Sequence, residues 1–200
     1  MRFEFIAGSL CLDFANTIHD SRAEDNEEEL HAISDLLHWA REARLLPWAD
    51  CDRLAAYYDR NPREASTALA KGTAIRDLLL SIFATIANGG SVPAQHLSAL
   101  NSALAQAPAL LRVHKHSRRI ETEWTSANDG VQQIFFAVLS SAAELLASDR
   151  LARVRECRSN VCTWLFVDES RNRSRRWCDM SSCGNRMKAR RHYQRAKAIQ

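Results

Sequence analysis

Residues 157–186 read CRSNVCTWLFVDESRNRSRRWCDMSSCGNR and hold four of the six cysteines of the chain. The cysteines form two pairs, Cys157-x4-Cys162 and Cys178-x4-Cys183, with fifteen residues between the pairs. Zinc binds four thiolates in a tetrahedron, and two close pairs on either side of a hairpin can supply them. A catalytic zinc site normally keeps one position open, so four cysteines favour a structural role. The spacing therefore predicts one structural zinc ion bound by Cys157, Cys162, Cys178 and Cys183.

Two disulfides or four unconnected thiols are the alternatives to a zinc site. The amino-terminal stretch does not predict export, because Glu4 and Asp13 bracket a short apolar run and no cleavage site of small residues follows. No stretch approaches the ~20 apolar residues of a membrane span, so we expect no membrane association. We expect a cytoplasmic protein, and in that compartment paired cysteines are more often metal ligands than disulfides. Cys11 and Cys51 stand alone in apolar surroundings and are expected to be buried core residues.

The segment between the cysteine pairs predicts a small finger. TWLFV and RRW have strand-like composition around a polar turn, and GNRMKARRHYQRAKA has the composition of a helix. A knuckle, a hairpin and a helix, with two ligands at each end, form the treble-clef arrangement. We expect this finger to cover residues 156–200, with Trp164, Phe166 and Trp177 as its small core. So few apolar side chains would need zinc to hold their shape.

Positive charge is concentrated in the same region as the cysteines. Residues 1–150 carry 14 Lys and Arg against 20 Asp and Glu, a net charge of −6. Residues 151–200 carry 13 against 4, a net charge of +9, and the two regions together give the +3 of the whole chain. Eleven of the 13 cations are arginine, which suits phosphate and guanine edges. A basic region on an acidic body predicts an anionic polymer as partner, with nucleic acid first.

On a helical wheel the cations of the last helix form two stripes, which could meet the two phosphate walls of a groove. A weakly apolar arc that includes Ala189 and Tyr193 is expected to pack back on the hairpin. The alternative is that the arginines only solvate a surface helix, and RNA remains an alternative to DNA. The residues that we expect at a nucleic-acid interface are Arg171, Arg173, Arg175, Arg176, Arg186, Lys188, Arg190, Arg191, Arg195 and Lys197.

Residues 1–155 predict a larger, mostly helical domain with small β elements. Apolar residues recur at helical spacing over residues 30–43, 62–88, 94–104 and 131–148, with proline or glycine at several of the boundaries. Alternation over residues 109–124 predicts a β-hairpin. The first twenty residues predict a short strand, a turn at Gly8-Ser9 and a second apolar stretch. The expected fold class is α+β, with this helical domain followed by the zinc finger.

Asp13, Asn16 and Thr17 form a polar cluster that we expect to follow a strand. These residues could line a pocket for a small ligand, or Asp13 and Asn16 could simply cap the turn. No phosphate loop, nucleophile elbow or carboxylate pair is present in the sequence. We therefore do not expect an enzyme, although a site assembled in residues 1–150 stays an alternative.

Two stretches resemble known families. Cys157, Cys162, Phe166-Val167-Asp168, Ser170-Arg171-Asn172, Arg175-Arg176-Trp177-Cys178 and Cys183-Gly184-Asn185-Arg186 resemble the CGNR zinc-finger family. Residues 10–17, LCLDFANT, are similar to the entry of the ABATE domain that precedes this finger. The resemblance implies a bacterial protein with an amino-terminal α+β domain that senses a ligand and a treble-clef finger that binds DNA. The family is described as stress-induced transcription regulators.

The leading hypothesis is a zinc-dependent, non-catalytic DNA-binding regulator whose larger domain senses an unknown small ligand or mediates assembly. The alternatives are a zinc-stapled protein-interaction or RNA-binding module, and a small-molecule enzyme. A single finger binds weakly, so a homodimer is compatible with the sequence, although no heptad supports it. We expect that Cys178→Ser unfolds the finger, abolishes DNA binding and leaves the larger domain folded.

Overall fold

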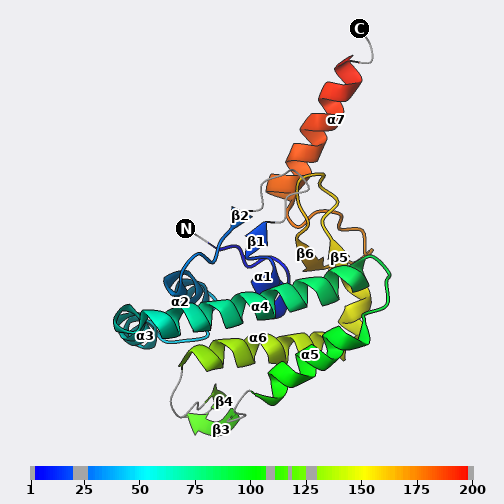
Figure 1. Cartoon of the computed structure of the whole chain (residues 1–200). Coiled ribbons are helices and arrows are strands. Elements are labelled where there is room, and N and C mark those ends of the chain that lie inside the picture. The colour runs from blue at the N-terminus through cyan, green and yellow to red at the C-terminus, as the bar shows by residue number, and fades with distance from the viewer. Residues whose placement is uncertain (1–2, 20–26, 107–110, 117–118, 125–129, 198–200) are drawn as a thin grey trace.

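A computed structural model of the chain describes residues 3–19, 27–106, 111–116, 119–124 and 130–197. The helices are α1 (Leu10–Ala15), α2 (Ile33–Glu42), α3 (Trp48–Arg60), α4 (Pro62–Ala87), α5 (Ala94–Ala105), α6 (Gly130–Leu146), the 3-10 turn η1 (Asp149–Arg153), the π-helical turn η2 (Met180–Gly184) and α7 (Asn185–Lys197). The strands are β1 (Ile18–His19), β2 (Glu27–Glu28), β3 (Leu111–His116), β4 (Arg119–Trp124), β5 (Val154–Glu156) and β6 (Leu165–Val167). Within the described residues the strands pair as three antiparallel two-stranded sheets. The fold is mostly helical, which confirms the α+β prediction (Figure 1).

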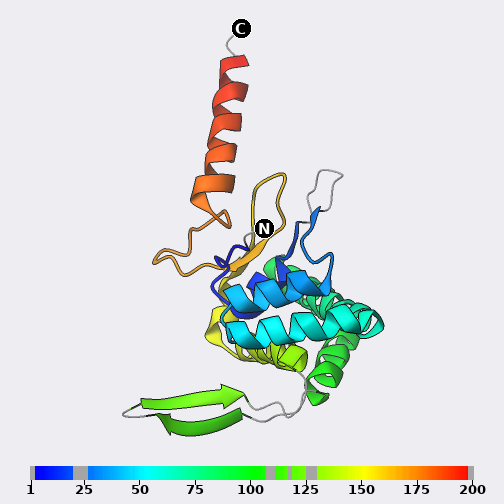
Figure 2. The same cartoon turned by 90° about the vertical axis from the view of Figure 1, so that its left-hand side faces the viewer.

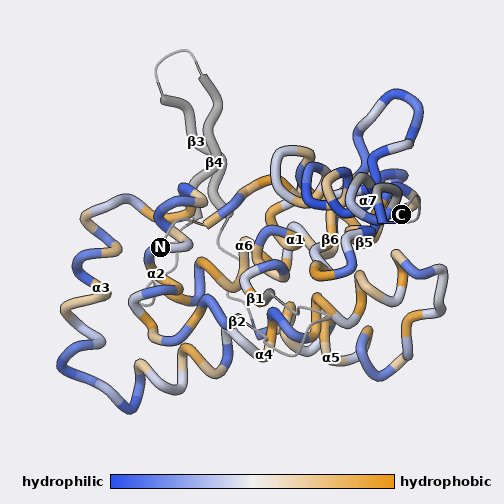
Figure 3. The backbone as a smooth tube through the Cα atoms, turned by 90° about the horizontal axis from the view of Figure 1, so that it is seen from above, coloured by the Kyte–Doolittle hydropathy of each residue, from blue (hydrophilic) through white to orange (hydrophobic). Residues whose placement is uncertain are grey.

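The long helix α4 spans the body, and α1, α2, α3, α5 and α6 all pack against it (Figure 1). Its apolar side chains Leu79, Ile82 and Phe83 are fully buried. Phe14 of α1 meets Trp39 of α2 at a centroid separation of 4.7 Å, and both rings are fully buried. Hydrophobic residues gather between α1, α4 and α6, whereas the surroundings of α7 are hydrophilic (Figure 3).

Local signals explain where the helices begin and end. Helix α4 starts at Pro62, where the missing amide costs nothing, and it stops before Gly89, whose φ is +74°. At the start of α2, the Asp35 carboxylate accepts hydrogen bonds from the amides of His31 and Ala32. The predicted helices of the larger domain are present, and so is the hairpin, as β3 and β4.

Residues 10–15 form a helix, so the expectation that Asp13, Asn16 and Thr17 follow a strand is wrong. The amides of Leu12 and Asp13 donate to the Ser9 carbonyl at 3.0 Å and open the first turn of α1. From Cys11 to Ala15 every residue of this helix is buried. A short helix that is buried on all sides shows no apolar period, and sequence alone therefore does not separate it from a strand.

The finger also pairs differently from the prediction. Strand β6 pairs with β5, with Val154 opposite Val167 and Glu156 opposite Leu165. The segment RRW, at residues 175–177, is not a strand. Its first amide, from Arg175, instead donates to the Asp168 carboxylate at 3.0 Å. The loop is thus closed by a side chain rather than by a strand ladder.

The finger and the helical body share one core. All three residues of β6 are fully buried, and β6 packs against α1 and α4. The four finger cysteines belong to the same hydrophobic cluster as Phe14 and Leu79. The expected boundary between residues 155 and 156 falls inside β5.

Two elements project from this body. Helix α7 extends away from it, and the hairpin of β3 and β4 extends in another direction (Figure 2). In the part of the chain that the structure describes, no helix combines the length and the apolar character needed to cross a membrane.

Candidate metal centre and nucleic-acid interface

The two cysteine pairs come together in the fold. The sulfur atoms of Cys157, Cys162, Cys178 and Cys183 all lie within 4.8 Å of one another, and all four residues are buried. The Cys178 sulfur is 3.7 Å from that of Cys162 and 3.7 Å from that of Cys183. Zn–S bonds of ~2.3 Å in a tetrahedron place neighbouring sulfurs about 3.8 Å apart. These distances fit a tetrahedral four-thiolate zinc site, and they exceed the ~2.0 Å of a disulfide bond.

Backbone hydrogen bonds hold the ligands in place. The Cys157 amide donates to the Trp164 carbonyl at 2.8 Å and closes the knuckle that carries the first pair. The Cys178 amide donates to the Cys157 sulfur at 3.4 Å, which links the two pairs directly. Cys183 lies on η2, where the Gly184 amide reaches back to the Asp179 carbonyl at 3.0 Å. The Asp179 carboxylate caps this turn by accepting from the Ser182 amide at 2.8 Å.

The thiols are electrostatically coupled. Hydrogen bonds from Cys162 and Cys178 lower the pKa of Cys157 to about 2. A hydrogen bond with Cys157 raises the pKa of Cys162 to about 12. A second hydrogen bond with Cys157 raises the pKa of Cys178. Metal binding requires the ligating cysteines to be deprotonated, and a bound divalent cation would stabilise their thiolate forms. Zinc supplies that charge, so the donor set fits a structural zinc ion.

Asp168 organises the loop that follows β6. Its fully buried carboxylate accepts hydrogen bonds from the Ser170 amide at 3.0 Å, the Ser170 hydroxyl at 2.5 Å and the Arg175 amide at 3.0 Å. Burial by itself would raise the pKa of Asp168, but the hydrogen bonds from Ser170 and Arg175 outweigh it and lower the pKa. The ionised carboxylate therefore ties both ends of the loop together.

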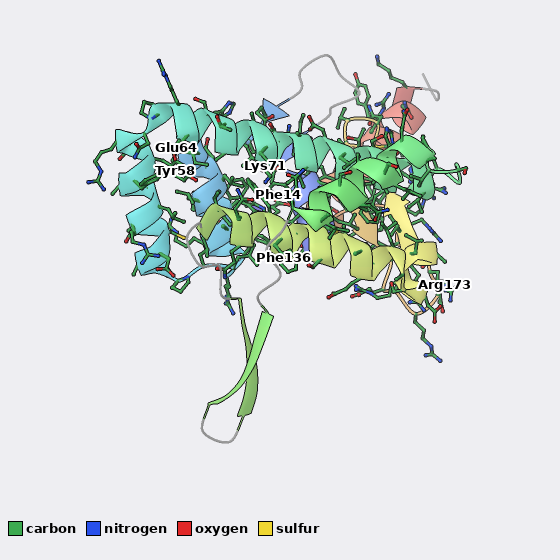
Figure 4. The ribbon with its side chains drawn as sticks, turned by 60° about the horizontal axis from the view of Figure 1, so that its bottom comes forward. Phe14, Tyr58, Glu64, Lys71, Phe136 and Arg173 are labelled. Atoms are coloured by element: carbon green, nitrogen blue, oxygen red, sulfur yellow. The ribbon has the colours of Figure 1, made fainter. Side chains whose placement is uncertain are left out.

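The tip of this loop displays two of the predicted interface residues. Arg171 and Arg173 are exposed, and Arg173 lies at the rim of the molecule, remote from the buried Phe14 (Figure 4). The Arg173 backbone has a φ of +50°, and its amide donates to the Ser170 carbonyl at 3.1 Å. Both arginines are therefore exposed at a tight turn of the loop.

Arg175 occupies a different position from the other arginines. Its guanidinium lies 4.4 Å from the centre of the Phe166 ring. It donates to the carbonyls of Trp177 at 3.0 Å, Ile6 at 3.2 Å and Cys178. These contacts join the loop, the second cysteine pair and the amino-terminal segment. Arg175 is therefore a structural residue of the finger.

Helix α7 presents its described cations to solvent. Arg186, Lys188, Arg190, Arg191 and Lys197 are exposed, and the side chain of Arg195 lies outside the described residues. Ala189 and Tyr193 are exposed as well, Tyr193 by 62%. The expected packing of this arc against the hairpin is therefore wrong, because α7 leaves the body (Figures 1 and 2).

The three aromatic residues that were expected to form the small core of the finger differ in burial. Trp164 and Phe166 are buried, at 6% and 0% exposure, in agreement with the predicted small core. Trp177 is only partly buried. The guanidinium groups of Arg176 and Arg191 lie 5.7 Å and 5.9 Å from the centre of its ring. Trp177 thus stands between the loop and α7.

The three candidate ligand-binding residues near the amino terminus are buried and bonded within the protein. The Asn16 side chain donates to the Leu165 carbonyl at 2.9 Å and accepts from the Leu165 amide at 2.8 Å. The Thr17 hydroxyl donates to the Phe14 carbonyl at 2.8 Å. The Asp13 carboxylate accepts from the Ala7 amide at 2.9 Å. Ligand binding by these residues stays a prediction.

Asp13 is the carboxyl group of this cluster, and its pKa is shifted. Burial raises its pKa to about 6, although hydrogen bonds from the Ala7 and Ile6 backbone act in the opposite direction. The backbone segment that bonds Asp13 also contacts the finger, because the Val167 amide donates to the Ala7 carbonyl at 2.8 Å. Arg150 donates to the Gly8 carbonyl at 2.6 Å. Residues 6–8 therefore lie between α1 and the finger.

Sequence reasoning missed the structural roles of Asp168 and Arg175. The Asp-x-Ser pattern directly after an apolar strand could have indicated the side-chain turn at Asp168, because Asp commonly bonds amides two residues ahead. No comparable signal singles out Arg175 among its neighbouring arginines. Its partners Ile6 and Phe166 become neighbours only in the fold.

The chain matches two protein families. Residues 8–149 match the ABATE family, described as "Putative stress-induced transcription regulator", and residues 153–196 match the CGNR zinc finger. No curated protein matched the chain. The ABATE match covers more than half of the 200 residues, and the finger match contains all four clustered cysteines. The chain belongs to the ABATE family and carries a CGNR zinc finger with one structural zinc ion.

Proposed function

We propose that this protein is a non-catalytic transcription regulator that binds duplex DNA through its zinc finger. The observation that carries the proposal is α7, which projects from the body and bears exposed cations but no acidic residue. Exposed arginine and lysine without acidic neighbours are the electrostatic footprint of phosphate binding. The regulator description of the ABATE family supports the same conclusion.

The shape of α7 suits a DNA groove. Its 13 residues span about 20 Å, and a major groove of about 12 Å width admits one helix. The described side chains of α7 from Lys188 to Arg191 are all exposed, so this part of the helix is open to a partner. Within a groove, cations on its flanks would meet both phosphate walls. Arg171 and Arg173 on the loop would reach phosphates outside the groove.

The helical body, residues 1–155, would sense a small ligand or mediate assembly. Asp13, Asn16 and Thr17 already bind backbone groups of the protein. A ligand that reached them would have to displace those bonds and would act directly on the contact between α1 and β6. Sensing at this position would therefore change how the finger is held.

A protein-interaction module and an RNA-binding module are the competing functions. The first would bind a partner protein and ignore DNA. The second would prefer RNA at equal salt and length. RNA stays an alternative because the finger has aromatic side chains that are exposed at least in part, Trp177 and Tyr193, and exposed aromatics can stack on unpaired bases.

The test is a titration of the zinc-loaded protein against labelled duplex DNA fragments at several salt concentrations, with duplex RNA as competitor. We expect an affinity that falls steeply with salt and a preference for particular fragments. Arg190→Ala should lower the salt slope by about one unit. Arg63→Ala, an exposed arginine at the far end of α4, serves as the matched control and should leave the slope unchanged. Absence of binding at low salt would reject the proposal.

A further inference from the structure

The Trp177 ring lies at a hollow in the finger surface. The hollow has a volume of about 420 Å³ and is lined by Ser170, Ser174, Arg175, Arg176, Trp177, Asp179 and Met180. It lies where the loop after β6 meets the start of η2. The indole packs against the core, and its exposed part beside cations has the composition of a nucleic-acid contact.

Two arginines from different elements converge on this indole. Arg176 comes from the loop, with its guanidinium 5.7 Å from the ring centre. Arg191 comes from α7, with its guanidinium 5.9 Å from the same ring. Both arginines are exposed, and within the described residues neither forms an ion pair with a carboxylate. The ring therefore links the position of the loop to that of the helix.

The other charged groups at the hollow already form hydrogen bonds within the protein. The Arg175 guanidinium donates to three backbone carbonyls. The Asp179 carboxylate accepts from the Ser181 hydroxyl and the Ser182 amide. With Arg175, the three guanidinium groups outnumber the single carboxylate of Asp179, so the site has a net positive charge that favours an anion.

We propose that Arg176, Trp177 and Arg191 form a single anchoring site for one backbone phosphate of a DNA duplex. This inference rests on the proposed function, and it specifies which cations act together. Trp177 is a positioning residue that keeps both planar guanidinium groups within 6 Å of the centre of one ring, which reduces the entropy lost on binding. A phosphate held by residues of both elements fixes the angle at which α7 enters the groove.

Salt dependence separates a shared phosphate from two independent ones. Each neutralised phosphate contributes about 0.9 to the slope of log affinity against log salt. For a shared phosphate, Arg176→Ala or Arg191→Ala alone changes the slope little, and the double variant lowers it by about 0.9. Two independent contacts would lower it by about 0.9 each and about 1.8 together. We also expect the double variant to lose affinity about tenfold or more.

Matched variants control for folding and for general loss of charge. Each variant must retain one equivalent of zinc. Arg171→Ala and Arg190→Ala have no common aromatic contact in the described residues, so their effects on the slope should add. Trp177→Phe keeps an aromatic ring and should preserve the coupling, whereas Trp177→Leu should abolish it. Coupling that survives Trp177→Leu would overturn the role of the ring.

Two outcomes distinguish failure of this inference from failure of the proposed function. If the wild-type protein does not bind DNA, the proposed function fails, and the anchoring site fails with it. If it binds DNA but the Arg176 and Arg191 effects are additive or absent, only the anchoring site is overturned. Emission from Trp177, taken as wild type minus Trp177→Phe, should change on binding DNA. An equal change with inorganic phosphate at the same ionic strength would assign the site to free anions instead.

Discussion

Asn16 joins the two family segments through a side chain that behaves like a strand partner. Its amide group makes both a donated and an accepted hydrogen bond with Leu165, 149 residues further along the chain. Asn16 is only 4% exposed, so water does not replace either bond if it is lost.

We expect Asn16→Asp to destabilise the protein by about 2 kcal/mol or more, because it removes the donor to Leu165 and buries a charge. Urea unfolding of the zinc-loaded protein measures the loss. Asn101→Asp makes the same change at an exposed position of α5 and should stay within about 0.5 kcal/mol. Equal effects of the two variants would contradict the role of Asn16.

Asp168 should make stability depend on pH in a defined direction. Its pKa is lowered in the folded state, so it stabilises the fold above the unfolded pKa of about 3.9 and stops doing so as pH falls through the lower folded value. We expect Asp168→Asn to cost about 1–3 kcal/mol at pH 7, since buried amides lose a charged acceptor. The difference from wild type should shrink below about pH 4.

Unfolding free energies of wild type and Asp168→Asn in the same buffers test this prediction. Zinc release at low pH affects both proteins, and the comparison between them removes that contribution. A constant difference from pH 7 down to pH 3 would show that ionisation of Asp168 does not support the loop.

At the scale of elements, Gly8 in the segment beside the finger and Gly184 in η2 should respond differently to substitution by alanine. Gly8 has a φ of +80°, a conformation that strains any residue with a Cβ. An added Cβ at Gly184 would lie 2.5 Å from the sulfur of Met180, but Met180 is 45% exposed and can move away. We expect Gly8→Ala to cost about 1 kcal/mol or more and Gly184→Ala to cost less.

Thermal unfolding of the two zinc-loaded alanine variants measures this contrast. A larger loss at Gly184 would mean that the packing of η2 around Cys183 is tighter than the exposure of Met180 indicates.

The helices of the body could be predicted because their apolar periods and their breakers are local. Pro62 and Gly89 delimit α4, and its buried residues recur at helical spacing. The four cysteines could also be predicted, since their spacing directly reflects zinc geometry. The helical state of Leu10–Ala15 could not be predicted, because a helix buried on all sides has no period.

The pairing of the finger strands depends on contacts between distant residues. Asp168 captures the Arg175 amide, and Arg175 in turn binds the Ile6 carbonyl, 169 residues away in sequence. The sequence shows that arginines are abundant here, but the fold decides which are structural. The position of Trp177 between Arg176 and Arg191 likewise arises only when the loop and α7 are assembled.

For the whole molecule, the shared core changes the expectation that the body survives loss of the finger. Strand β6 is fully buried against α1 and α4, so disorder in the finger would expose apolar surface of the body. We expect zinc chelation to lower the stability of the entire chain, because metal bound only by the folded state stabilises that state. Cys178→Ser should act in the same way.

Hydrogen exchange with and without a zinc chelator measures this coupling. Amides of α1 should lose protection together with those of β6, whereas the α2 and α3 pair should change least. Full protection of α1 after chelation would restore the picture of two independent units.

Residues 6–8 accept hydrogen bonds from Val167, Arg175 and Arg150. They thereby supply backbone acceptors that the finger lacks on its own. A finger transplanted alone onto a foreign scaffold would leave Val167 without its acceptor and Leu165–Val167 open to water. Engineers who want to move its specificity would need to carry residues 6–16 along, or to redesign the face of β6. Exchange of fingers between relatives would likewise have to preserve both residues 6–16 and the face of β6 that they contact.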